Sequence, residues 1–152
     1  MFLAGGITGC EDWQPRLVTL LDDASTGEFR NLVVFNPRRE NFPIGDPTAA
    51  EAQIQWEYEH LSVADMVSFW FAGGDSLQPI TMLEFGRWTG QKKPIVVGCD
   101  PTYKRRQDVE IQHKLARSGH VWEKLSDVAM DIKRQAADLY WRRERGAMGP
   151  FA

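Results

Sequence analysis

The sequence predicts an α/β fold in which a five-stranded parallel sheet is covered by helices on both faces. Short apolar runs alternate with amphipathic stretches along the chain, and this alternation is typical of repeated βα units. With 152 residues, of which 43% are hydrophobic and 26% charged, the chain is long enough to bury a substantial core. We expect a single domain over residues 1–145, followed by a short tail over residues 146–152.

The apolar runs that we predict as strands read, in chain order, FLAGG, LVVF, MVSFWF, PIVVG and HVWE. Each is followed by a helical pattern that Asp, Ser, Pro or Gly opens or closes. Right-handed crossovers and the strand count favour a flavodoxin-like order in a three-layer α/β/α arrangement, although other doubly wound orders fit the same pattern. The predicted strands span residues 2–6, 32–35, 66–71, 94–98 and 120–123, and the predicted helices span residues 13–23, 48–64, 79–89, 105–117 and 126–145.

Charge and cysteine content limit the classes of function. The net charge of −3 gives no general attraction to nucleic acid or to anionic membranes. Cys10 and Cys99 lie far apart, and the chain shows neither a charged and apolar leader nor a long apolar span. The three histidines have no metal-ligand spacing with one another or with the cysteines. We therefore expect a soluble protein of the cytoplasm that does not bind a metal ion.

A glycine-rich turn, residues 3–10, follows the first predicted strand and precedes the first predicted helix. Gly5 and Gly6 could let a ligand approach the backbone closely, or they could simply form a tight turn. The turn has neither the GxGxxG spacing of a dinucleotide site nor the Gly-Lys-Ser/Thr of a P-loop. Bound NAD or ATP is not expected, and no other cofactor is predicted.

Glu84 is the strongest candidate for a catalytic residue. It lies near the start of a helix that follows a buried strand. In open α/β sheets the ligand crevice forms at the carboxyl ends of the strands, where the helix N-termini face it. A carboxylate in this position can act as a nucleophile.

Glu57 is a second acid of interest, on the helix predicted over residues 48–64. Residues three and four apart share a helix face, so Glu57 stands with Gln53, Ile54 and Leu61. This places it beside the predicted buried face, while a solvated glutamate on the helix surface is the alternative.

Five segments of the chain resemble the nucleoside 2-deoxyribosyltransferase family, whose superfamily also contains the 2'-deoxynucleoside 5'-monophosphate N-glycosidases. The resemblance extends over nearly the whole chain. It implies a compact flavodoxin-like domain that builds its site at subunit contacts and moves 2-deoxyribose between bases. The segments are Phe2-Leu3-Ala4-Gly5-Gly6-Ile7, Asn36-Pro37-Arg38-Arg39, Gln55-Trp56-Glu57-Tyr58-Glu59, Ala64-Asp65 and Leu83-Glu84-Phe85-Gly86.

The resemblance implies roles for both acids. The nucleophilic glutamate of the family falls on Glu84, and the acid that exchanges a proton with the base falls on Glu57, counted back from Asp65. The family usually has Asp at the second position. Many members also carry a Tyr that hydrogen-bonds the nucleophile, and Phe2 stands at that position here.

The segment before Glu84 also departs from the family pattern, in which small residues and glycine stand just before the nucleophile, often with an acid that holds the sugar hydroxyl. Asp75, Gln78 and Thr81 are the substitutes that we consider. Trp13 and Phe42 could form apolar walls against the base, with core packing as the alternative. Asn36 and Arg38 lie near the predicted crevice, where the guanidinium could bind substrate or its phosphate, or form a solvated ion pair. The predicted substrate-binding residues are Gly5, Gly6, Trp13, Asn36, Arg38, Phe42, Asp75, Gln78 and Thr81.

The expected activity is therefore exchange of purine or pyrimidine bases on 2-deoxyribose through a covalent intermediate on Glu84. The expected ligands are 2'-deoxynucleosides and free nucleobases, with no nucleic-acid polymer, and a homo-oligomer is expected. Two alternatives stay open. One is hydrolysis of 2'-deoxynucleoside 5'-monophosphates, and the other is a nucleoside-binding module without catalysis.

Overall fold

A single parallel sheet organises the chain in the computed structural model, which describes residues 1–22, 32–39 and 46–144. Each strand pairs in parallel with the next one in sequence, giving the order β1-β2-β3-β4. The register places Phe2 beside Val67 and Val67 beside Ile95. The strands are β1 (Phe2–Gly5), β2 (Val67–Phe71), β3 (Ile95–Cys99) and β4 (Val121–Trp122).

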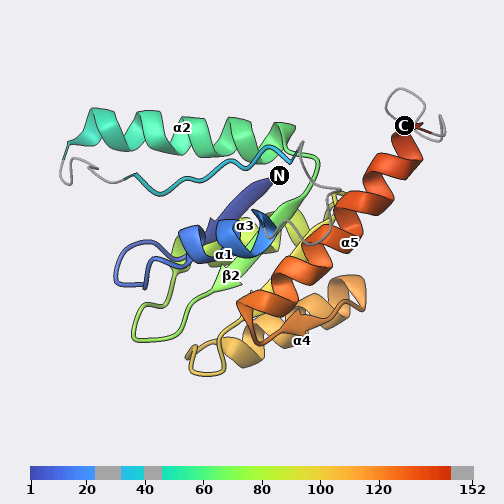
Figure 1. The fold of residues 1–152 in the computed structure, drawn as a ribbon. Coiled ribbons are helices and arrows are strands. Elements are labelled where there is room, and N and C mark those ends of the chain that lie inside the picture. The colour runs from blue at the N-terminus through green and yellow to red at the C-terminus, as the bar shows by residue number, and fades with distance from the viewer. Residues whose placement is uncertain (23–31, 40–45, 145–152) are drawn as a thin grey trace.

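Helices cover both faces of this sheet (Figure 1). Alternate residues of each strand point to opposite faces, so the strands feed two separate apolar clusters. One cluster contains side chains of α1 and α5, and the other contains side chains of α2, α3 and α4. The helices are α1 (Trp13–Asp22), α2 (Pro47–Val63), α3 (Pro79–Thr89), α4 (Arg106–Arg117) and α5 (Leu125–Glu144).

The prediction of a fifth strand over residues 32–35 is wrong. In the described residues this segment forms only one parallel bridge, between Phe35 and Phe2, at the outer edge of β1. Phe35 N donates to Met1 O at 2.9 Å, and Phe35 O accepts from Leu3 N at 3.0 Å. Pro37 follows closely and has no N–H with which to extend a ladder. The segment therefore lies alongside the sheet without forming a strand.

The predicted helices and the other four strands are confirmed with shifts of one or two residues at the ends that the structure describes. α2 begins after Asp46, whose side chain accepts hydrogen bonds from Thr48 N and Ala49 N, with Pro47 at the first helical position. In the described part of the chain no helix is both long and apolar enough to cross a bilayer. Phe42 and the predicted tail over residues 146–152 lie outside the described residues.

Candidate active site

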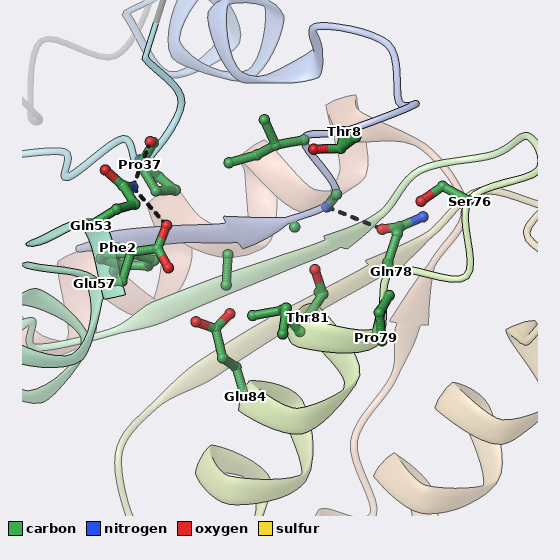
Figure 2. Close-up of a pocket in the computed structure, with 15 residues that line it drawn as sticks. Phe2, Thr8, Pro37, Gln53, Glu57, Ser76, Gln78, Pro79, Thr81 and Glu84 are labelled. Carbon is green, nitrogen blue, oxygen red and sulfur yellow. Dashed lines mark hydrogen bonds between the residues drawn. The ribbon is translucent and has the colours of Figure 1, made fainter. Parts of the chain in front are cut away.

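A pocket of about 440 Å³ opens beyond the carboxyl end of β1, between α2 and the start of α3 (Figure 2). β1 and the turn after it form one wall, and α2 and α3 each supply one carboxyl group. This is where the parallel sheet was expected to place a ligand site. Its lining residues are Phe2, Ala4, Gly5, Gly6, Ile7, Thr8, Pro37, Gln53, Glu57, Ser76, Gln78, Pro79, Ile80, Thr81 and Glu84.

Glu84 enters the pocket from the second turn of α3. The helix begins with Pro79, and Phe85 fixes the helix to the sheet because its ring packs edge-on against Phe69 and Phe71, each at 5.4 Å between centroids. Glu84, the neighbour of Phe85, is half-buried and lines the pocket. Burial, and secondly the charge of Glu57, raise the pKa of Glu84 to about 7.

Glu57 reaches the pocket from α2. One turn before it on the same face, Gln53 Nε2 donates to Glu57 Oε1 at 2.7 Å and to the carbonyl oxygen of Pro37 at 3.0 Å (Figure 2). Burial raises the pKa of Glu57, while the hydrogen bond from Gln53 and the charge of Arg39 act in the opposite direction. Gln53 therefore orients the carboxyl group and leaves Oε2 as the oxygen available to carry a proton.

The two carboxyl groups are electrostatically coupled. Since the charge of Glu57 raises the pKa of Glu84, ionising both groups is unfavourable, and near neutral pH the pair tends to hold one proton. A pair of this kind combines a proton donor with a carboxylate. These are the two groups needed to break a glycosidic bond with acid assistance.

The Gly5-Gly6 turn lines the pocket, and it also packs tightly against Trp13 and the backbone of Trp70. A Cβ atom on Gly5 would lie 2.4 Å from Trp13 Cζ2 and 2.5 Å from Trp70 O, so only glycine fits there. Trp13 is fully buried below this turn, and its Nε1 donates to Gly6 O at 3.0 Å. The turn therefore presents backbone to the pocket while Trp13 supports it from the core.

Polar side chains gather where α3 begins. Thr81 is 4% exposed and lies one turn before Glu84 on the face that lines the pocket, and Ser76 and Thr8 line the same region (Figure 2). The residue at the N-cap of α3, Gln78, makes no side-chain hydrogen bond to the first turn of the helix. Hydroxyl groups and the positive end of a helix dipole thus face one part of the cavity, which suits an oxygen-rich group.

Several residues predicted to bind substrate do not line the pocket. Trp13 is a core residue. Asn36 Oδ1 accepts from Arg38 N at 3.0 Å, so it closes a local turn. Asp75 is exposed and pairs with Lys104 Nζ at 2.6 Å. The remaining predicted residue, Phe42, lies outside the described part of the chain.

Arg38 is not among the residues that line the pocket. Its Nε donates to Gln14 Oε1 at 2.9 Å and lies 3.1 Å from Asp12 Oδ1. Its NH2 group donates to the carbonyl oxygens of Glu11 at 3.0 Å and Ile7 at 3.3 Å. The guanidinium thus stabilises the loop between β1 and α1 through Nε and NH2, two of its three nitrogens.

The structure adds pocket residues that the sequence had not identified as binding residues. Thr8 lies within the glycine-rich turn, and Ser76 lies in the loop before α3. The sequence had indicated both of these segments as parts of the site, without naming these two residues. Gln53 shares a helix face with Glu57, which was a signal for a supporting role. Ile7 lies in the same glycine-rich turn and Pro37 in a segment that carries the family resemblance, whereas Ile80 had no such signal. Within the described residues, no three His, Cys, Asp or Glu side chains are grouped so as to hold a metal ion.

Comparison with known families gives one match. The sequence model of a family described as "nucleoside 2-deoxyribosyltransferase like" matches residues 1–103, a stretch that contains both carboxyl groups and every residue lining the pocket. No curated protein matches the chain.

Proposed function

We propose that this chain, which belongs to the nucleoside 2-deoxyribosyltransferase-like family, exchanges nucleobases on 2-deoxyribose through a covalent intermediate on Glu84. The observation that carries the proposal is the placement of Glu84 and Glu57 in one pocket, where the charge of Glu57 and burial together raise the pKa of Glu84 to about 7. The substrates are 2'-deoxynucleosides and free bases, and the chain's own residues supply the acid, the base and the nucleophile.

In the first half-reaction the ionised carboxylate of Glu84 attacks the anomeric carbon of the sugar. A C–O bond forms and the C–N bond to the base breaks, so that the bonding electron pair passes to the base nitrogen. Protonated Glu57 gives its proton to the departing base, while Gln53 holds the other oxygen of that carboxyl group. The sugar is then an ester on Glu84.

In the second half-reaction an incoming base attacks the same carbon. The C–O bond to Glu84 breaks, the carboxylate is regenerated, and Glu57 takes the proton that the new base loses. Transfer in preference to hydrolysis requires that water be kept from the ester. Phe2, Ala4, Ile7 and Ile80 give the pocket apolar surface that favours a base over water.

The test is an exchange assay followed by liquid chromatography. The protein is incubated with thymidine or deoxyadenosine, with and without a different free base. A new deoxynucleoside that forms only with the acceptor base is the expected result. E84Q should form none, whereas E51Q, which changes an exposed glutamate of the same α2 helix that carries Glu57, should match the unmodified protein. Binding of a deoxynucleoside without any turnover would contradict the proposal and favour a binding module.

A second candidate is hydrolysis of 2'-deoxynucleoside 5'-monophosphates. The hydroxyl groups of Ser76 and Thr81 beside the start of α3, and that of Thr8 in the turn after β1, favour it, because an anion is stabilised at a helix N-terminus. Arg38 no longer supports it, since its guanidinium is engaged in the β1–α1 loop. Release of free base from a 5'-monophosphate, at a rate independent of acceptor base, would favour this candidate over the transferase.

A further inference from the structure

Gln78 joins the two loops that border the pocket. Its Oε1 accepts from Gly6 N at 3.0 Å, in the turn after β1 (Figure 2). Its Nε2 donates to Ala72 O at 2.7 Å, just beyond β2. Gln78 is 4% exposed, so both bonds are shielded from water. The side chain was expected to bind substrate, but both ends of its amide group bind backbone instead.

The contacts fix the orientation of this amide group. A backbone N–H can only donate and a carbonyl oxygen can only accept, so Oε1 must face Gly6 and Nε2 must face Ala72. The backbone of Gln78 is left-handed, with φ 47° and ψ 54°, a conformation that costs a non-glycine residue about 1 kcal/mol or more. The two buried hydrogen bonds offset this strain.

The strained residue is also the N-cap of α3, the helix that carries Glu84. Gln78 O accepts from Met82 N at 3.0 Å, which begins the hydrogen bonding of α3. Tyr103 Oη donates to the carbonyl oxygen of the preceding Leu77 at 2.8 Å. The start of α3 is thus held both by the turn of Gly6 and by Tyr103.

We propose that Gln78 is a positioning residue, which sets the separation between the Gly6 wall of the pocket and the helix that carries Glu84. This rests on the proposed function. Loss of the two bonds frees the turn and the helix start to move independently, and displacements of about 1 Å in an active site cost up to about 100-fold in rate. The sugar and the nucleophile would still meet, but less often in a reactive geometry.

The test compares Q78M with Q78E. Q78M keeps the length of the side chain and removes both hydrogen bonds, and we expect kcat to fall about 10-fold to 100-fold with a smaller change in KM. In Q78E the ionised carboxylate can still accept from Gly6 but repels Ala72 O, whereas the protonated acid can donate to it. The kcat of Q78E relative to the unmodified protein should therefore recover as the pH falls, and that of Q78M should not. Q107E, which changes an exposed glutamine on α4, is the control and should leave kcat unchanged.

Amide hydrogen exchange of Gly6 in the ligand-free protein gives a readout that does not depend on activity. Slow exchange in the unmodified protein, fast exchange in Q78M, and exchange in Q78E that slows as the pH falls relative to the Q107E control would support the connection. Equal protection of Gly6 in Q78M would overturn it. A reduced Tm in Q78M with unchanged kcat would overturn the positioning role, because a purely structural residue gives that result. If the unmodified protein moves no sugar, the proposed function fails, and the exchange of Gly6 still decides whether the connection exists.

Discussion

Glu57 and Glu84 line the same pocket from the helices that precede and follow β2, and the charge of Glu57 helps to raise the pKa of Glu84 to about 7. Burial is the larger cause of that shift. Among the described residues none donates a hydrogen bond to Glu84, whereas Glu57 accepts one from Gln53. The proton is therefore held more firmly on Glu84 in the ligand-free protein, and the reactive form has that proton on Glu57 while Glu84 is ionised.

The rate of base exchange should depend on pH through the pair of carboxyl groups. The mechanism needs one proton on the pair, with Glu84 ionised and Glu57 protonated, so kcat/KM should fall as the pH increases through about 7, where the pair loses this proton. In E57Q the neutral side chain donates no proton and only the ionisation of Glu84 matters, so the residual kcat/KM should rise with pH to a plateau and not fall near pH 7. A profile measured with thymidine and an acceptor base checks this. A fall of the same size near pH 7 in both proteins would contradict the sharing of one proton by the two carboxyl groups.

Replacing Glu84 by Gln should stabilise the fold at neutral and alkaline pH. The pKa of Glu84 is raised from 4.5 to about 7, so between these values the folded state holds a proton that the unfolded state has lost, and stability falls as the pH rises. The E84Q variant lacks this loss and should be more stable by about 1–3 kcal/mol above pH 7. Urea denaturation at several pH values measures the difference, which should vanish at a pH below 4.5. If the two free energies of unfolding instead differ by the same amount at every pH, the effect comes from packing and not from the titration of Glu84.

Substitutions of the two acids should differ in severity. E84Q removes the nucleophile, and we expect the exchange rate to fall about 1000-fold or more. E57Q removes only the proton transfer to the base, for which a loss of about 100-fold is expected. Rates for bases that leave easily without protonation should be affected least by E57Q. Single-turnover measurements compare the two variants, and equal losses for every base would contradict separate roles.

Arg38 should matter for stability and not for phosphate binding. Its guanidinium binds Gln14, Asp12 and two carbonyl oxygens of the β1–α1 loop, so R38A should lower the free energy of unfolding by about 1–3 kcal/mol. The preference between a 2'-deoxynucleoside and its 5'-monophosphate should not change. Denaturation and the ratio of the two kcat/KM values test both statements. A selective loss of monophosphate activity would place Arg38 at the substrate.

The sequence predicted the two carboxyl groups from signals that are local along the chain. Glu84 came directly from the order of strand and helix in an open parallel sheet. For Glu57 the spacing on one helix face left a solvated position open, and the family resemblance placed it in the site. The structure accordingly places both residues in the pocket.

The wrong strand, and the contacts that the sequence did not indicate, arose where long-range contacts decide the structure. Residues 32–35 have the composition of a strand, yet they lie at the sheet edge, where Val33 is 64% exposed and only Phe35 forms a bridge. Arg38 has a long side chain that could have bound any of several loops. The amide group of Gln78 binds backbone groups near two different strands, and no spacing in the sequence indicates which of them it meets.

The most direct test of the central claim is to identify the residue that carries the sugar. The protein is mixed with a 2'-deoxynucleoside without an acceptor base, quenched with acid, and digested for mass spectrometry. We expect a mass increase of one 2-deoxyribosyl group on the peptide that contains Glu84, absent in E84Q and lost when an acceptor base is added before the quench. A sugar adduct on another residue, or exchange by E84Q at the rate of the unmodified protein, would contradict the account.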